Sequence, residues 1–236
     1  MHQPTNLPIS QSANLSFAVL WDLDGTLVDT KEFHFKSWAL ALPEFGFDFP
    51  ADRFERSFGM NNTGVLEVFL DRPVEPALVQ AIGERKEMLF RSLLRGNVQA
   101  LPGVQDWLKR LRGWSARQAV ASSAPPANID IMLGELGIAG YFDAIVSGYT
   151  LPSKPDPAVF LQAAQQIGVA PRDCIVMEDA VAGVAAARRA GMRCIAVTST
   201  NPAAALHGAN LVVERWDRLD EAGFLHLLSA GNRRVD

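Results

Sequence analysis

The chain has 236 residues, of which 48% are hydrophobic, and its formal net charge is −4 at pH 7. This slightly acidic balance offers no attraction to nucleic acid or to an anionic membrane surface, which excludes both as expected partners. The sequence has no uninterrupted apolar run of about 18 residues, and residues 1–8 lack the basic and apolar regions of a signal peptide, so we expect a cytoplasmic protein.

The length and the hydrophobic content suffice for one large domain or for a domain that carries an insertion. Residues 1–15 are rich in Gln, Pro, Ser and Asn and show little periodicity, which is typical of a disordered tail. Cys174 and Cys194 lie in apolar runs that resemble strands, and two cysteines are too few for a disulfide framework or a zinc site. We expect both to be buried thiols.

The apolar segment 17–21 predicts a buried strand, and the stretch after it contains only helical patterns. The predicted helices cover residues 31–45, 50–58, 64–70 and 75–94. A connection between two strands of a parallel sheet seldom needs so many residues. We therefore predict that residues 31–97 form an all-helical cap inserted after the first strand, with hinges at Thr30-Lys31 and at 97–102.

From residue 98 onward, short apolar strands alternate with helices. The predicted strands are 118–121, 144–146, 174–177, 194–197 and 209–212, and the predicted helices are 104–111, 128–136, 158–167, 181–190 and 219–228. Such alternation predicts a parallel sheet with helices on both faces. The fold class is therefore α/β, with a core formed by residues 16–30 and 98–236.

The first predicted strand ends in a concentration of negative charge. Asp22 and Asp24 stand two residues apart at its end, and Gly25 and Thr26 come directly after. The carboxyl ends of parallel strands open onto the ligand crevice, where two ionised carboxylates this close need a cation or a shared proton. A bound Mg²⁺ is the simpler solution. The alternative is an Asp-rich turn without function, since Asp and Gly are common in turns.

The segment from Asp22 to Thr30, Asp-Leu-Asp-Gly-Thr-Leu-Val-Asp-Thr, closely resembles the first motif of the haloacid dehalogenase-like phosphotransferase superfamily. In that superfamily the first Asp is the nucleophile and the second is the general acid/base. The resemblance implies that Asp22 forms an aspartyl phosphate and that Asp24 transfers protons.

Polar residues also follow three later strands. Ser122-Ser123 follows 118–121, Lys154-Pro155 lies in the loop after 144–146, and Glu178-Asp179 follows 174–177. Taken singly, Ser122 could cap a helix, Lys154 could be a solvated surface charge, and the acidic pair could favour a helix start. In this order and spacing they resemble the second, third and fourth motifs of the same superfamily, over a core from about residue 17 to residue 212.

Together the four motifs supply what phosphoryl transfer requires: a nucleophile, a cation and fixed hydrogen-bond donors. Ser122 offers hydroxyl and backbone donors, and Lys154 offers a compact positive charge. We expect oxygen ligands to hold Mg²⁺: the carboxylates of Asp22, Glu178 and Asp179 and the carbonyl oxygen of Asp24. The candidate catalytic residues are Asp22, Asp24, Ser122 and Lys154.

The resemblance also implies a Rossmannoid core with a helical cap, in agreement with the separate prediction for residues 31–97. Thr30, Glu32-Phe33-His34-Phe35 and Trp38 match the hinge and first cap helix of the β-phosphoglucomutase-like and sugar-phosphate phosphatase group. His34 is then a candidate for steadying the leaving or attacking oxygen; the alternative is a helix-surface residue without a partner. The candidate substrate-binding residues are His34, Gly59, Asn61, Asn62, Lys86 and Ser123.

Two departures from the mutase pattern favour a phosphatase. A mutase must hold a second phosphate in the cap, and this chain has Asn62 where the mutases carry Arg. Ala124-Pro125 stands where the mutase pattern has a phosphate-holding Ser and Lys, although Arg85 and Lys86 could bring positive charge to the cap. We expect a Mg²⁺-dependent phosphatase, monomeric or weakly dimeric, that acts on a small phosphorylated metabolite such as a sugar or polyol phosphate.

Three alternatives remain open at this point. A β-phosphoglucomutase-type mutase would use the same aspartyl phosphate and release no net phosphate. Dehalogenation is disfavoured, because the haloacid dehalogenases lack an acid/base Asp at the position of Asp24 and need no metal. A non-catalytic binding module would need damaged motifs, and all four motifs are intact.

Overall fold

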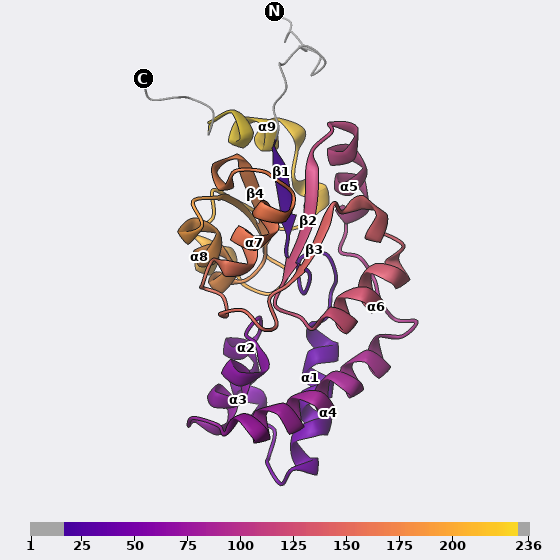
Figure 1. The fold of residues 1–236 in the computed structure, drawn as a ribbon, viewed down its shortest axis with the longest axis vertical. Helices are drawn as coiled ribbons and strands as arrows, with labels where there is room; N and C mark the ends of the chain where they lie inside the picture. The colour runs from indigo at the N-terminus through magenta and orange to yellow at the C-terminus, as the bar shows by residue number, and fades with distance from the viewer. Residues whose placement is uncertain (1–16, 231–236) are drawn as a thin grey trace, which may run out of the picture.

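A parallel β-sheet forms the centre of the computed structural model, which describes residues 17–230 (Figure 1). Within these residues, six strands lie in the order β3-β2-β1-β4-β5-β6. The strands are β1 (Ala18–Trp21), β2 (Arg117–Ser122), β3 (Ala144–Ser147), β4 (Cys174–Glu178), β5 (Arg193–Val197) and β6 (Leu211–Val213). β1 pairs in parallel with β2 on one side and with β4 on the other. The residues after β1 therefore lie in the middle of the carboxyl edge of the sheet.

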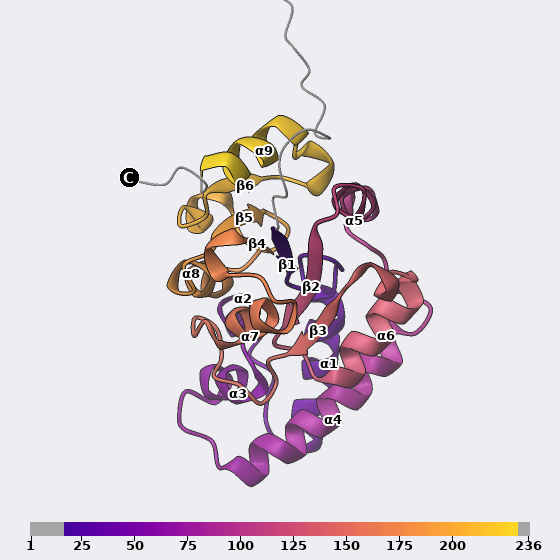
Figure 2. The ribbon, with the colours of Figure 1, turned by 45° about the horizontal axis from the view of Figure 1, so that its top comes forward.

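Helices cover both faces of the sheet (Figure 2). α5 (Val104–Gly113), α6 (Pro126–Leu136) and α9 (Glu221–Ala230) pack on one face, and α7 (Ala158–Gln166) and α8 (Val181–Arg189) pack on the other. Within β1, Val19 and Trp21 belong to the first core and Ala18 and Leu20 to the second. Successive side chains of a strand point to opposite faces, so a strand covered on both sides is apolar throughout. The predicted α/β fold is confirmed.

Helices fill the stretch between β1 and α5. They are α1 (Lys31–Glu44), α2 (Ala51–Ser57), α3 (Asn62–Leu70) and α4 (Pro76–Leu94), and they lie together below the sheet in Figure 1. Their apolar side chains form a core of their own, which includes Trp38, Leu42, Phe54, Leu66, Phe69 and Ile82. The end of α4, with Phe90 and Leu94, packs into the main core instead. The insertion is helical, and its boundaries as a domain, at residues 31 and 97, stay a prediction.

The two segments that connect this insertion to the sheet run side by side. Val28 forms an isolated bridge with Ala100, and the Leu101 N–H donates to the Leu27 carbonyl oxygen at 3.0 Å. The predicted hinge 97–102 includes Ala100 and Leu101, and the predicted hinge Thr30-Lys31 starts two residues after Val28. Their role as hinges stays a prediction.

The predicted elements agree with the structure to within a few residues, and the shifts at the C-terminal end have local causes. Ala203–Leu206 form a short 3₁₀ helix, and the Ala209 N–H donates to the carbonyl oxygen of Leu206. β6 therefore starts at Leu211 and not at residue 209 as predicted. α9 starts at Glu221 because the Leu219 N–H donates to Trp216 and closes a second such turn.

Three other expectations concern the two cysteines, membrane-spanning segments and the N-terminal tail. Cys174 and Cys194 are free and buried, as predicted. Among residues 17–230, none of the helices combines the length and the hydrophobicity that a membrane span requires. The tail predicted for residues 1–15 lies outside the described residues.

Candidate active site

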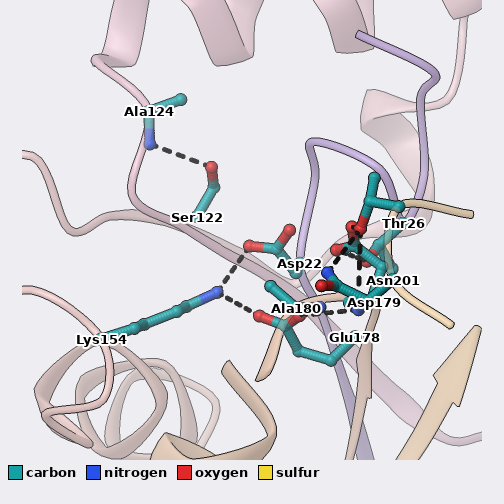
Figure 3. A network of polar contacts seen from close by, with 10 residues as sticks. Asp22, Thr26, Ser122, Ala124, Lys154, Glu178, Asp179, Ala180 and Asn201 are labelled. Atoms are coloured by element: carbon teal, nitrogen blue, oxygen red, sulfur yellow. Dashed lines mark hydrogen bonds and ion pairs between the residues drawn. The ribbon is translucent and has the colours of Figure 1, made fainter. Parts of the chain in front are cut away.

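One pocket lies at the carboxyl ends of β1, β2 and β4, and the helical insertion lines its other side. The candidate catalytic, metal-binding and substrate-binding residues all line it: Asp22, Asp24, His34, Gly59, Asn61, Asn62, Lys86, Ser122, Ser123, Lys154, Glu178 and Asp179. Figure 3 shows the side chains of Asp22, Lys154 and Glu178 pointing toward one another. The sheet order brings these loops together, since β1 lies between β2 and β4. The functions assigned to these residues stay predictions.

Lys154 joins two carboxylates at the centre of the site (Figure 3). Its Nζ donates to Asp22 Oδ1 at 2.6 Å and to Glu178 Oε1 at 2.8 Å. The side chain is buried, and Nζ lies 4.7 Å from the centre of the Phe160 ring. Burial alone would lower the pKa of Lys154, but the two carboxylates raise it above its ordinary value. Lys154 is therefore a charged, buried residue, and the alternative of a solvated surface charge is wrong.

Asp22 has an unusually high affinity for a proton in this site. Burial raises the pKa of its carboxyl to about 8, although the charge of Lys154 acts in the opposite direction. The neighbouring charges of Glu178 and Asp24 raise the pKa further. An additional positive charge close to Asp22 would therefore be needed to hold it fully ionised at neutral pH.

Glu178 is fixed by backbone donors. Its Oε2 accepts the N–H groups of Asp179 and Ala180, both at 2.6 Å. A Cβ on residue 183, in the first turn of α8, would lie 1.6 Å from Glu178 Oε1, so only glycine leaves room for this carboxylate. Glycine inside a helix costs about 0.5–1 kcal/mol relative to alanine. Glycine at position 183 therefore lowers the stability of α8 slightly but leaves the space that the Glu178 carboxylate occupies.

Asp179 is held by the loops that follow β1 and β5. Its Oδ1 accepts from Thr26 Oγ1 at 3.0 Å, and its Oδ2 accepts from the hydroxyl of Thr200. The Asn201 Nδ2 donates to the Asp179 carbonyl oxygen at 3.1 Å. Gly25 has a φ of +79°, and a Cβ there would lie 2.2 Å from Asp179 Oδ2, so both the backbone and the space require glycine.

The sequence analysis missed Thr200 and Asn201. The available signal was a polar run, Thr198-Ser199-Thr200-Asn201, directly after the apolar strand β5. This is the same signal that identified the other four strand ends.

Asp22, Glu178 and Asp179 together fit a divalent cation. Each offers a carboxylate oxygen, and these three atoms lie within 4.8 Å of one another. All three residues are buried, and burial together with the charges of Glu178 and Asp22 raises the pKa of Asp179 well above its ordinary value. These three buried carboxyl groups share one ammonium partner, so all three can be ionised together only with a further positive charge beside them. An all-oxygen donor set of this kind suits a hard cation such as Mg²⁺.

Asp24 lies in a second polar network, which leads into the helical insertion. Its Oδ1 accepts from Thr30 Oγ1 at 2.6 Å and lies 3.0 Å from His34 Nε2. His34 Nδ1 lies 2.9 Å from Lys86 Nζ. An ammonium group can only donate, so Nδ1 accepts and the ring proton resides on Nε2, which donates to Asp24. Lys86 therefore selects the His34 tautomer, and the alternative of a histidine without a partner is wrong.

The protonation states of this network follow from the same contacts. Burial and the positive charge of Lys86 lower the pKa of His34, so the ring is neutral at pH 7. Burial alone would raise the pKa of Asp24, but the hydrogen bonds from His34 and Thr30 hold it below its ordinary value. Asp24 is therefore an ionised carboxylate at neutral pH, unlike its neighbour Asp22.

The network continues from α4 to α6. Lys86 Nζ donates to Glu87 Oε1 at 2.9 Å, and Asn128 Nδ2 donates to Glu87 Oε2 at 2.6 Å. Arg91 Nη1 donates to Asn128 Oδ1 at 3.1 Å, so one amide of the sheet domain joins two side chains of the insertion. The sequence analysis missed Glu87 and Asn128, because a carboxylate within a helix and an amide near a helix start carry no distinguishing pattern.

Ser122 lines the pocket and stabilises its own turn. Its hydroxyl accepts the Ala124 N–H at 3.0 Å (Figure 3). α6 begins at Pro126, after Pro125, without a side-chain cap. The alternative that Ser122 caps this helix is therefore wrong.

Two residues of the predicted helical cap domain, Asn61 and Arg85, make contacts that the sequence analysis did not expect. Asn61 lines the pocket but also caps α3, since its Oδ1 accepts the Gly64 N–H at 3.0 Å. Arg85 pairs with Glu44 on the exposed side of α4 and is absent from the pocket lining, whereas Lys86 lines it.

A family profile described as haloacid dehalogenase-like hydrolase matches residues 19–197. The chain is 34% identical over 210 residues to the β-phosphoglucomutase of Bacillus subtilis (strain 168), which covers 86% of this chain and 91% of that protein. It is 31% identical over 182 residues to the fructose-1-phosphate phosphatase of Escherichia coli (strain K12), covering 76% and 95%. The crystal structure of β-phosphoglucomutase from Clostridium difficile is similar with a TM-score of 0.82 and 26% identity, over 91% of this chain and 98% of that one. The chain therefore belongs to the haloacid dehalogenase-like hydrolase family, among relatives that are sugar-phosphate phosphatases and a β-phosphoglucomutase.

Proposed function

We propose that the protein is a Mg²⁺-dependent phosphatase that hydrolyses a small phosphate monoester, such as a sugar or polyol phosphate, through a phosphorylated Asp22. The observation that carries this proposal is a pair of carboxylates, two residues apart, with opposite surroundings. Asp22 lies against Lys154 in the acidic cluster, whereas Asp24 bonds to Thr30 and to neutral His34. One carboxylate is suited to meet phosphorus, and the other is suited to move a proton.

In the first step, a carboxylate oxygen of Asp22 attacks phosphorus, and the bond from phosphorus to the ester oxygen breaks as the new bond forms. Asp24 gives a proton to the departing oxygen, so that the alcohol leaves neutral. Asp24 is ionised in the free site, and the negative charge of a bound phosphate group raises its affinity for this proton. Once the proton has left, the Nε2–H of His34 stabilises the Asp24 carboxylate.

In the second step, Asp24 takes a proton from a water molecule, whose oxygen attacks phosphorus. The bond between phosphorus and Asp22 breaks, Asp22 leaves as a carboxylate, and inorganic phosphate departs. Asp24 then holds the proton that the next turnover needs. Lys154 faces the reacting carboxylate in both steps, where its charge opposes the negative charge that develops on the phosphoryl oxygens.

Mg²⁺ would be held by the carboxylates of Asp22, Glu178 and Asp179 and by the carbonyl oxygen of Asp24. When bound, it neutralises negative charge on the phosphate oxygens and holds Asp22 in its ionised form.

A phosphomutase is the second candidate, because a relative of 34% identity is a β-phosphoglucomutase. The mutase reaction needs donors for a second phosphate group. Asn62 and Ala124-Pro125, at the positions where the mutase pattern has Arg and Ser-Lys, favour water as the acceptor.

A panel of sugar and polyol phosphates, assayed with Mg²⁺ and with EDTA, tests the proposal. We expect steady release of inorganic phosphate from at least one ester with Mg²⁺, and its loss with EDTA and in Asp22→Asn. Conversion of a sugar phosphate into its isomer without phosphate release would favour the mutase. Halide release from a haloacid without metal would favour a dehalogenase, and conversion of none of these compounds would contradict the proposed function.

A further inference from the structure

The helical insertion gives the pocket a part that differs in character from the carboxylate cluster. This part is lined by Phe54, Phe58, Met60 and Asn62, and the neighbouring loops of the sheet domain add Pro125 and Tyr149. If Asp22 reacts with the phosphate of an ester, as the proposed function requires, the rest of the alcohol extends toward these residues. Their chemistry therefore determines which alcohols the site accepts.

Positive charge in the pocket is already paired. Among the described residues that line it, the cationic side chains are Lys154 and Lys86. Lys154 contacts Asp22 and Glu178, and Lys86 contacts Glu87 at 2.9 Å and His34 at 2.9 Å. Lys86 is 2% exposed. Burial alone would raise the pKa of Glu87, but the charge of Lys86 and the hydrogen bond from the Asn128 amide lower it, so Glu87 is ionised. Neither lysine therefore offers uncompensated charge to a second anionic group.

The start of α6, which adds Pro125 to this part of the pocket, offers few backbone donors. The start of a helix normally attracts anions through its free N–H groups. At the start of α6, Pro125 and Pro126 have no N–H, and the N–H of Asn128 donates to the Pro125 carbonyl oxygen at 3.0 Å. The Ala124 N–H is taken by the Ser122 hydroxyl.

What the insertion does offer is neutral. Asn62 lines the pocket, and its buried Nδ2, which lies beside Gly83 of α4, lacks a hydrogen-bond partner among residues 17–230, so its amide is an uncharged donor. Beside it are the aromatic and thioether side chains of Phe54, Phe58 and Met60. A second phosphate or a carboxylate would lose its water here without gaining a counter-charge.

We propose that the site takes phosphate monoesters whose remote end is uncharged, and that it discriminates against substrates carrying a second phosphate or a carboxylate there. This selectivity deepens the proposed function and rests on it. The preferred substrates are therefore phosphate esters of small, neutral, hydroxylated alcohols. Two features cause the discrimination: Lys86 is already paired with Glu87, and residue 62 is not a cation.

Two matched pairs of compounds test the selectivity. Glycerol 3-phosphate and 3-phosphoglycerate differ only in a hydroxymethyl group against a carboxylate, and fructose 1-phosphate and fructose 1,6-bisphosphate differ only in the second phosphate. In each pair that shows turnover, we expect kcat/KM to be at least about 100-fold higher for the compound whose remote end is neutral. This ratio is equivalent to about 2.7 kcal/mol. Values within about threefold of each other would overturn the inference while leaving the phosphatase assignment intact.

Binding to Asp22→Asn separates failure of this inference from failure of the proposed reaction. Calorimetric Kd values of the four compounds with Mg²⁺ do not depend on turnover, and we expect the same preference for the neutral members. If the variant binds the neutral members more tightly but the wild-type protein releases no phosphate, the selectivity is supported and the proposed reaction is contradicted. Equal binding within a pair, or binding of none of the four compounds, contradicts the selectivity.

A charge added at residue 62 tests the cause. Asn62→Arg should narrow the kcat/KM ratio of each pair at least about tenfold, because it supplies the missing counter-charge. Thr63→Arg adds the same charge on the next, exposed residue outside the pocket lining and should leave the ratio unchanged. If Asn62→Arg does not fold, Glu87→Gln removes the charge that pairs with Lys86 and should narrow the ratio in the same direction. An unchanged ratio in a folded variant would contradict the cause.

Discussion

Asp22 and Asp24 are two positions apart and have opposite proton affinities. Asp22 has a pKa of about 8 because burial outweighs its bond to Lys154, whereas hydrogen bonds from His34 and Thr30 hold the pKa of Asp24 below its ordinary value. Without a cation this order is the reverse of the one that a nucleophile and a general acid require, so the proposed roles depend on the cation beside Asp22 and on the phosphate charge near Asp24. The sequence gives both residues the same side chain, and only their neighbours distinguish them.

Asp24→Asn tests the proton-transfer role. We expect kcat for the best ester to fall about 10²–10⁴-fold, the usual contribution of a general acid or base. The amide keeps an oxygen for the bonds from Thr30 and His34, so far-UV circular dichroism and Tm should change little. A kcat within about threefold of wild type would contradict the role.

Gly183→Ala tests the space that Glu178 requires. The added Cβ would lie 1.6 Å from Glu178 Oε1, so we expect lower stability and weaker Mg²⁺ binding, measured by urea unfolding and by calorimetry. Gly134→Ala, in helix α6, is the control, because a Cβ there meets no atom within 4 Å. Alanine normally stabilises a helix by about 0.5–1 kcal/mol relative to glycine, so the two variants should change stability with opposite signs. Equal effects would contradict the steric argument.

At the scale of elements, α4 connects the insertion to the sheet domain through charge. Its residues Lys86, Glu87 and Arg91 reach His34 on α1 and Asn128 on α6. A shift of α4 relative to α6 would break the bonds of Glu87 and Arg91 to Asn128. The arrangement around Asp24 therefore depends on contacts between the insertion and the sheet domain.

Glu87→Gln gives this junction a pH signature. The folded pKa of Glu87 is lower than the unfolded value, so its charge stabilises the protein above the unfolded value of 4.5 and this contribution is lost as pH falls through the folded pKa. We expect the variant to be about 1–3 kcal/mol less stable than wild type at pH 7, with a difference that shrinks below pH 4.5.

Urea unfolding at a series of pH values measures this difference. Glu84→Gln, on an exposed face of the same helix, is the control and should stay within about 0.5 kcal/mol of wild type throughout. A difference for Glu87→Gln that is constant with pH would contradict the charge argument.

The elements themselves could be predicted from the sequence with small errors, because the apolar runs of β1, β2, β4 and β5 report burial on both faces. The site residues at strand ends could be predicted because the carboxyl ends of parallel strands meet at one edge of the sheet, and because their order resembles the four motifs of the family. Glu87 and Asn128 could not be predicted. Their bond joins residues 41 apart on two helices, and no periodicity of either helix reports it.

At the scale of the whole molecule, the acidic cluster exists only when β1 and β4 are adjacent. The register pairs Trp21 with Met177, so Asp22 and Glu178 follow side by side. A cation held by these carboxylates binds the folded chain and not the unfolded one, and folding is thereby linked to metal.

Mg²⁺ should therefore raise Tm. At a concentration about 100-fold above Kd, the expected stabilisation is about 2.7 kcal/mol, and EDTA should reverse it. Differential scanning calorimetry of wild type and Asp179→Asn checks this, since the variant loses one of the three clustered carboxylates. An equal shift in both proteins would contradict a metal site at this cluster.

The central claim is that Asp22 carries the phosphoryl group between ester and water. The most direct measurement is acid quenching of the enzyme during turnover of an ester with a radiolabelled phosphate, followed by mapping of the labelled peptide. We predict label on the peptide that contains Asp22, and none in Asp22→Asn. Phosphate release by wild type with no labelled protein at any time, or with label on another residue, would contradict the account.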